Sequence, residues 1–269
     1  MSPQLHVETA GSGPDLALLH GWGLHGRVWC DVAGSLARSF TVHAVDLPGH
    51  GLSPRVAGGL GGWVAVLADT LPPAHVVGWS LGGQLALALA AARPPQVRSL
   101  VLVATTPRFV AAPDWAPAVA VIVFADFAAD LRRDPQATLS RFLALQTQGD
   151  ERARNAARDL RARLGERSMP EPDTLAEALA ILAGNDLRGI AGDVTVPALL
   201  VHGGRDPLVP AAAVRWLAGA LPQAQVQEFP TAAHAPFVSA PEAFADTVTV
   251  FVSLLEQHAA DRQRRRAGR

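Results

Sequence analysis

Short, nearly continuous apolar runs constrain the fold of this chain more than any other feature of its sequence. They recur through the first 103 residues, at residues 16–19, 41–45, 75–78 and 100–103, and a helix-like segment at 83–92 follows the third run. Apolar runs without polar alternation are typical of parallel strands that helices cover on both faces. The pattern therefore predicts an α/β fold with a mostly parallel central sheet flanked by helices.

The strand pattern returns near the C-terminus and is absent from the middle of the chain. Residues 197–202 and 226–229 are the expected last two strands, and a closing helix is expected at 241–257. The middle stretch is helical in pattern and is punctuated by prolines. The chain is thus expected to divide into a core at 1–107 and 184–258, an inserted helical cap at 108–183, and a disordered basic tail at 259–269.

Composition narrows the classes of function. Of the 269 residues, 49% are hydrophobic and 17% charged, which excludes a disordered, collagen-like or coiled-coil chain. Acidic residues balance the arginines to a formal net charge of −1, so we expect no nucleic-acid partner. The longest apolar run, at 118–125, is far shorter than the roughly 20 residues of a membrane span, and no secretory leader pattern opens the chain. Because Cys30 is the single cysteine, we expect no internal disulfide and a cytoplasmic location. The short apolar runs lead us to expect no membrane attachment.

One pentapeptide carries the chemistry of a nucleophile. Gly78-Trp79-Ser80-Leu81-Gly82 fits the pattern G-x-S-x-G, between a predicted strand and a predicted helix. A sharp strand-to-helix turn needs small residues on both sides of the serine, and it exposes the serine hydroxyl above the sheet. The alternative is a glycine-rich turn that contains a serine by chance, which the flanking strand and helix disfavour. Ser80 is therefore the candidate nucleophile.

A serine nucleophile requires a histidine base and an acid that orients it. Asp206 follows the predicted strand at 197–202 on a glycine turn, and His234 follows the last predicted strand. The chain order Ser, Asp, His is that of the α/β-hydrolase triad. Taken singly, Asp206 could be a turn aspartate and His234 a surface histidine. His202 is expected to be packed or backbone-bonded, and structural roles are expected for the histidines before the serine, His20, His25 and His50.

Two backbone N–H groups are candidates for stabilising the oxyanion that forms during hydrolysis. Leu81 directly follows the candidate nucleophile, and Trp22 lies in the glycine-flanked loop after the strand at 16–19. The same loop, at 21–26, also fits G-x-G-x-x-G. We reject a dinucleotide site, because Trp22 is bulky for a pyrophosphate cradle and a turn explains Asp46, the acidic residue about 20 residues on. No cofactor and no metal are expected.

These motifs together resemble the α/β-hydrolase superfamily over the whole chain. More narrowly, Arg141-Phe142-Leu143-Ala144-Leu145-Gln146 and Ala232-Ala233-His234-Ala235-Pro236-Phe237 resemble the pimeloyl-[acyl-carrier protein] methyl ester esterases of biotin biosynthesis. The resemblance implies a cytoplasmic monomer that hydrolyses the methyl ester of a pimeloyl chain carried on acyl-carrier protein. It also implies substrate contacts at Trp22, Ser80, Leu81, Phe142, Leu143, Ala144, Leu145, Gln146 and His234.

The cap segment has two further features. Phe142, Leu143 and Leu145 can line a channel for a methylene chain, or they can be the core of the cap itself. Between residues 141 and 167 there are seven arginines against four acids, and an acidic carrier could dock on them. A solvated helix face is the alternative, and Ala137 stands where the related caps tend to carry another basic residue. The candidate docking residues are Arg141, Arg154, Arg158 and Arg161.

The leading hypothesis is a serine carboxylesterase in which Ser80 attacks the ester, His234 transfers protons and Asp206 orients His234. Because one fold hosts many functions, two alternatives stay open. One is a general short-chain carboxylesterase, and the other is a non-catalytic small-molecule receptor built on the same fold.

Overall fold

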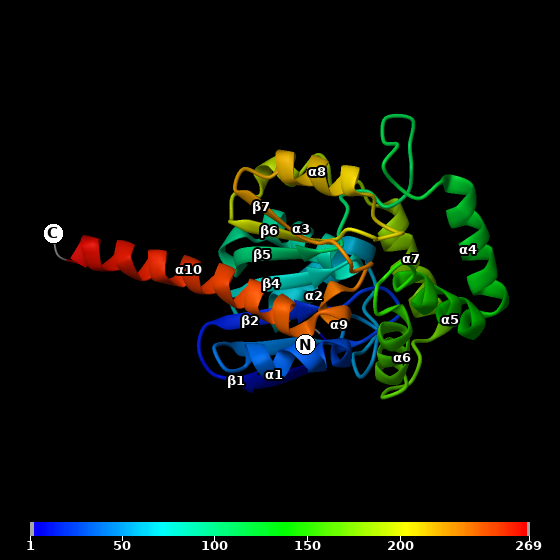
Figure 1. The fold of residues 1–269 in the computed structure, drawn as a ribbon, viewed down its shortest axis with the longest axis horizontal. Coiled ribbons are helices and arrows are strands. Elements are labelled where there is room, and N and C mark those ends of the chain that lie inside the picture. Colours follow the sequence, from blue (N-terminus) through cyan, green and yellow to red (C-terminus); the bar gives the residue numbers. More distant parts are fainter. Residues whose placement is uncertain (1–2, 268–269) are drawn as a thin grey trace.

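A seven-stranded sheet forms the centre of the molecule. The computed structural model describes residues 3–267. The strands are β1 (Val7–Gly11), β2 (Asp15–Leu19), β3 (Thr41–Val45), β4 (Ala74–Trp79), β5 (Val97–Val103), β6 (Ala198–Gly203) and β7 (Ala224–Phe229). Their order is β1-β3-β2-β4-β5-β6-β7, with β1 antiparallel to β3 and every other pair parallel (Figure 1). The predicted parallel sheet is confirmed.

Helices cover both faces of the sheet because its central strands are apolar on both sides. One face packs against α2 (Gly59–Thr70), α3 (Leu81–Ala92) and α8 (Ala211–Ala220), and the other against α1 (Cys30–Leu36) and α10 (Pro241–Ala267). Successive residues of a strand point to opposite faces of the sheet. In β2, Ala17 and Leu19 pack toward α2, α3 and α8, whereas Leu16 and Leu18 pack toward α1 and α10. All four are fully buried.

Four helices form a layer over one end of the sheet. They are α4 (Val121–Arg133), α5 (Pro135–Gln146), α6 (Ala153–Leu164) and α7 (Pro172–Gly184), and they connect β5 to β6. Figure 1 shows them gathered at the right of the molecule, beside the ends of the strands. We call these helices and the segments joining them the cap. Asp134 accepts a hydrogen bond from the N–H of Ala137 and thereby caps the start of α5, where Pro135 fits the first helical turn.

Two elements differ from the sequence expectations. Strand β1 was not predicted, because it is an edge strand with largely exposed side chains and no apolar run. Helix α10 continues to Ala267, so the prediction of a disordered tail from residue 259 is wrong as far as Ala267. Alanine, glutamine and arginine are strong helix formers, and they extend a helix whose first half is anchored on the sheet. Residues 268–269 of the predicted tail lie outside the described residues.

None of the helices within residues 3–267 has the length and apolar character that crossing a membrane requires.

Candidate active site

Ser80 occupies a strained turn between β4 and α3. Its φ is 54° and its ψ is −113°, a conformation that non-glycine residues rarely adopt. The N–H of Ser80 donates to the carbonyl of Val103 on the neighbouring strand at 2.9 Å, which fixes the turn to the sheet. A Cβ added at Gly82 would lie 2.3 Å from the carbonyl oxygen of Leu19, so only glycine permits this close approach. The predicted strand–turn–helix context of the serine is confirmed.

Asp206 and His234 meet across the loops that follow β6 and β7. Oδ2 of Asp206 lies 2.8 Å from Nδ1 of His234, and both side chains are almost completely buried. The other carboxylate oxygen accepts hydrogen bonds from the N–H groups of Leu208 at 2.8 Å and Val209 at 3.0 Å. These three contacts hold the carboxylate in the orientation that faces the imidazole. Nε2 of His234 is buried, and no hydrogen-bond partner for it occurs among residues 3–267.

Trp79 joins the nucleophile turn to the histidine loop, which we define as residues 230–235. Its indole N–H donates to the carbonyl of His234 at 2.9 Å, and the two rings lie 5.7 Å apart. Strands β4, β6 and β7 are parallel, so the residues that follow them lie at the same end of the sheet, where the carboxyl ends of the strands meet. Ser80, Asp206 and His234 are thus gathered at this end of the sheet. The cap helices adjoin the same end (Figure 1).

The remaining histidines that the sequence set aside have packing roles. His202 is buried, and its Nδ1 lies 4.0 Å from Oδ2 of Asp206, too far for a hydrogen bond. Burial lowers the pKa of His202. His20 bridges the carbonyl of Gly21 at 2.8 Å and the N–H of Leu47 at 2.9 Å. His50 lies 2.9 Å from the carbonyl of Pro48, and His25 lies 3.4 Å from that of Leu164.

The two candidate oxyanion donors belong to different elements. Leu81 is the first residue of α3, where backbone N–H groups have no partner within the helix. Trp22 lies in the loop after β2, and its indole N–H donates to the carbonyl of Leu175 on α7 at 2.9 Å. This bond and the burial of the ring fix the loop backbone beneath the cap.

An apolar cavity of about 60 Å³ lies between Trp22 and the cap. The rings of Trp22 and Phe142 meet edge to face at 5.1 Å, and Phe127 completes the cluster at 5.5 Å from each. The residues that line the cavity, among those the structure describes, are all apolar or aromatic: Trp22, Phe109, Val119, Val123, Phe124, Phe127, Phe142, Leu145, Leu179, Leu182 and Leu208.

The residues of segment 142–146 lie in four different environments. Phe142 and Leu145 line the apolar cavity, whereas Leu143 packs in the core layer that contains Ala235 of the histidine loop. Ala144 is exposed, and Gln146 is buried with its carbonyl accepting the N–H of His234 at 3.0 Å. The structure therefore brings two of the five predicted contacts to the cavity and a third, Gln146, against the histidine.

Comparison with known proteins identifies the family. A family model of the alpha/beta hydrolase fold matches residues 16–241. The chain is 45% identical over 242 residues to the pimeloyl-[acyl-carrier protein] methyl ester esterase of Nitrosomonas europaea, covering 89% of this chain and 96% of that protein. It is 49% identical over 237 residues to the same-named esterase of Chromobacterium violaceum, covering 87% and 92%. The chain belongs to the pimeloyl-[acyl-carrier protein] methyl ester esterase family.

Solved structures of lower sequence identity share the fold. An esterase from Exiguobacterium antarcticum superposes with a TM-score of 0.83 at 20% identity, covering 93% of this chain and 95% of that one. An enol-lactonase from Burkholderia xenovorans superposes with a TM-score of 0.78 at 24% identity, covering 93% and 96%. The arrangement of sheet and cap is therefore that of α/β hydrolases.

The four candidate docking arginines of this esterase-family member are not equivalent. Arg141 is paired with Asp130 of α4 at 2.8 Å, and Arg158 contacts its neighbour Asp159 at 3.1 Å. Arg154 and Arg161 are exposed on α6, and no ion pair involving them occurs within residues 3–267. The two arginines with the greatest freedom to meet a partner are thus Arg154 and Arg161.

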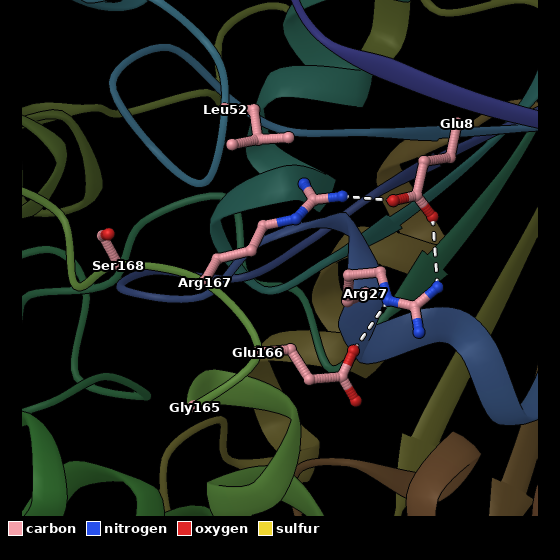
Figure 2. Close-up of a pocket in the computed structure, with 7 residues that line it drawn as sticks. All are labelled: Glu8, Arg27, Leu52, Gly165, Glu166, Arg167 and Ser168. Carbon is pink, nitrogen blue, oxygen red and sulfur yellow. Dashed lines mark hydrogen bonds and ion pairs between the residues drawn. The ribbon is translucent and has the colours of Figure 1, made fainter.

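A charged pocket of about 770 Å³ lies where the segment after α6 meets the core. Figure 2 shows Arg167 reaching toward Glu8 while Arg27 lies between Glu8 and Glu166. Arg27 contacts Glu166 at 2.7 Å and Glu8 at 3.4 Å, and Arg167 also contacts the fully buried Asp46. The hydrogen bond from Arg27 holds the pKa of Glu166 below its usual value. These paired charges connect the cap to the first strand of the core.

Sequence reasoning missed several residues that shape the site. The phenylalanines of α4 occur at Phe124 and Phe127, a spacing of three that could have indicated a common helix face. Trp79 was seen only as the variable position of the pentapeptide. Asp150 follows α5 and accepts a hydrogen bond from the residue before His234. Nothing local in the sequence points to that contact, because its two residues are 83 positions apart.

Proposed function

We propose that this protein hydrolyses the methyl ester of a pimeloyl chain carried on acyl-carrier protein, releasing methanol and the free acid in biotin biosynthesis. The observation that carries the proposal is the 2.8 Å contact between Asp206 and His234 at the sheet edge that also holds the strained Ser80. The names of the relatives in Nitrosomonas and Chromobacterium supply the substrate.

In the proposed reaction, Oγ of Ser80 attacks the ester carbonyl while Nε2 of His234 takes the hydroxyl proton. The negative charge that develops on the carbonyl oxygen is met by the N–H groups of Trp22 and Leu81, and losing one such donor typically costs about 10²–10³-fold in rate. His234 then gives its proton to the departing methoxide, and methanol leaves. A water molecule, activated by the same nitrogen, attacks the acyl-enzyme and releases the free carboxylic acid.

The acyl chain is proposed to lie along the apolar cavity beneath α4 and α5. Phe142 and Leu145 line this cavity, and burial of each methylene group contributes about 0.8 kcal/mol. Leu143, Ala144 and Gln146 stay predicted contacts from the family resemblance.

The partner is proposed to be an acidic acyl-carrier protein that docks on α6, with the esterase acting as a cytoplasmic monomer. Exposed Arg154, Arg158 and Arg161 supply the complementary charge, and Arg141 lies on the adjoining α5. Long-range attraction of this kind weakens as salt screens it.

The deciding experiment compares kcat/KM for the carrier-bound pimeloyl methyl ester and for a short p-nitrophenyl ester, in the wild type and in Ser80→Ala, at two salt concentrations. A salt-sensitive preference for the carrier-bound ester that is lost in Ser80→Ala is the expected result. A preference for the small ester would favour a general short-chain carboxylesterase. Absence of an acyl-enzyme burst with any ester would favour a receptor.

Charge reversal tests the docking surface separately. Arg154→Glu combined with Arg161→Glu is expected to raise KM for the carrier-bound ester and to leave the small ester unchanged. Arg38→Glu, an exposed arginine on the core after α1, is the matched control. Equal effects on both esters would contradict carrier docking at α6.

A further inference from the structure

We propose that Asp150, in the cap, is a positioning residue for His234. The proposal rests on the serine-hydrolase function proposed above, and it adds a residue that does not touch the reacting atoms. Asp150 belongs to the segment 147–152 between α5 and α6, which we call the cap linker. The proposed role is to hold the histidine loop in the position from which His234 can serve Ser80.

The carboxylate of Asp150 bridges the cap linker and the histidine loop. Oδ2 accepts the N–H of Ala233 at 3.0 Å, and Oδ1 accepts the N–H of Arg152 at 2.7 Å. Asp150 is only 8% exposed and Ala233 is fully buried. Hydrogen bonds from an N–H group to a carboxylate are stronger than those to a neutral acceptor. The residue immediately before the candidate base is therefore fixed by a cap side chain.

Further hydrogen bonds join the same two segments. The N–H of His234 donates to Gln146 at the end of α5, and the N–H of Glu151 donates to the carbonyl of Thr231, both at 3.0 Å. Arg205, next to the candidate acid, donates from its guanidinium to the carbonyl of Gly149 at 3.1 Å. The backbone of the histidine loop is thus hydrogen-bonded to the cap at three points, residues 231, 233 and 234, and Asp150 supplies the only side chain among these three contacts within the described residues.

This arrangement makes the position of the base depend on the cap. Without the carboxylate, the buried N–H of Ala233 loses its acceptor, and an unsatisfied buried donor is costly enough to favour movement of the loop. A displacement of about 1 Å in a catalytic group can reduce the rate about 100-fold. Because Asp150 also lines a pocket of about 410 Å³ behind the histidine loop, a small carboxylate can reach the vacated position.

The test uses Asp150→Ala in the full-length protein, with Glu151→Ala as the matched control. Glu151 is exposed and its contact to Thr231 is made by the backbone, so the control removes a neighbouring carboxylate without removing a contact to the histidine loop. Asp150→Asn is the conservative variant. It keeps one acceptor oxygen, but its amide group must face one of the two N–H donors.

We expect kcat for a p-nitrophenyl ester to fall about 10- to 100-fold in Asp150→Ala, with KM within about twofold of the wild type. The loss should be smaller in Asp150→Asn, absent in Glu151→Ala, and partly restored by added formate. The measurements are made well below the melting temperature of each variant, so that the folded fraction stays constant. A wild-type kcat in Asp150→Ala, or a loss that only follows unfolding, would overturn the proposal.

A second readout does not depend on turnover. The Nδ1 proton of His234, which lies in the hydrogen bond to Asp206, is followed by NMR. In Asp150→Ala it is expected to exchange with water faster than in the wild type and in Glu151→Ala. An unchanged exchange rate would overturn the positioning role even if the wild type proved inactive toward esters, an outcome that would count against the proposed function alone.

Discussion

Trp79 donates its indole N–H to the carbonyl of His234 across 2.9 Å, so the residue before the candidate nucleophile holds the loop of the candidate base. The two residues are 155 positions apart in the chain and come from different strand ends. A single hydrogen bond therefore ties together two loops whose relative position decides whether proton transfer can occur.

Replacing Trp79 by Phe is expected to lower both stability and kcat. The ring is retained in part, but the carbonyl of His234 loses its donor, at a cost of about 1 kcal/mol beyond the change in size. Trp29→Phe is the matched control, because the buried Nε1 of Trp29 has no hydrogen-bond partner among residues 3–267. Urea denaturation and esterase assays of both variants check this prediction. Equal losses in the two variants would contradict it.

Asp206→Asn is expected to lower kcat about 10⁴-fold with little change in KM. An amide at this position cannot both accept the N–H groups of Leu208 and Val209 and keep an acceptor oxygen toward Nδ1 of His234. The histidine would then favour the wrong tautomer for taking a proton from serine. Steady-state kinetics with a p-nitrophenyl ester measures the effect. A loss below tenfold would argue against Asp206 as the orienting acid.

Gly83→Ala and Gly34→Ala are expected to change stability in opposite directions. A Cβ at Gly83 would lie 1.9 Å from Oγ1 of Thr105, and Cβ of Thr105 is itself 2.8 Å away, so rotating the threonine gives no relief. We expect a loss of about 1–3 kcal/mol. At Gly34, in α1, an added Cβ would have no described atom within 4 Å apart from its chain neighbours and its own helix backbone, so alanine should add about 0.5–1 kcal/mol. Thermal or urea denaturation of both variants distinguishes the two signs.

The free energy of unfolding is expected to fall as the pH drops from about 6.5 to 4. Burial lowers the pKa of His50 to about 4, and burial together with the nearby His50 lowers that of His20. At pH values between the ordinary histidine pKa of about 6.5 and these lowered pKa values, the two histidines are protonated in the unfolded chain but not in the folded chain, so acid favours unfolding. Each such group contributes up to about 1.4 kcal/mol per pH unit.

His50→Gln isolates one of these groups. Glutamine can still donate to the carbonyl of Pro48 but does not titrate, so the slope of unfolding free energy against pH should be shallower by up to one proton. Urea denaturation at a series of pH values from 7.5 to 4.5 provides the slope. Identical slopes in the variant and the wild type would show that His50 is protonated equally in both states.

The sequence predicted those parts of the molecule whose cause is local. Five of the seven strands follow apolar runs, and Ser80 is marked by glycines within two positions of it. The order of Ser80, Asp206 and His234 also follows from the chain alone. Strand β1 escaped prediction because its five residues, Val-Glu-Thr-Ala-Gly, contain no run of large apolar side chains.

Contacts between distant segments could not be predicted in the same way. The partners of Trp79 and Asp150 are backbone groups. Because every residue carries nearly the same backbone, the amino-acid type at these partner positions does not indicate the contact. The continuation of α10 illustrates another limit. The charge of its arginine-rich end is typical of a solvated, disordered tail. The end is nevertheless helical, because its residues have high helix propensity and the first half of the helix is anchored on the sheet.

The direction of α10 has a practical consequence for handling this protein. A helix of 27 residues is about 40 Å long, and Figure 1 shows its C-terminal half extending from the sheet on the side opposite the cap. An affinity tag, a fluorophore or a surface linkage attached at the C-terminus would therefore stand off from the body on a helical stalk. The protein could be immobilised in this way with the cap, and any carrier that docks on it, turned toward the solution.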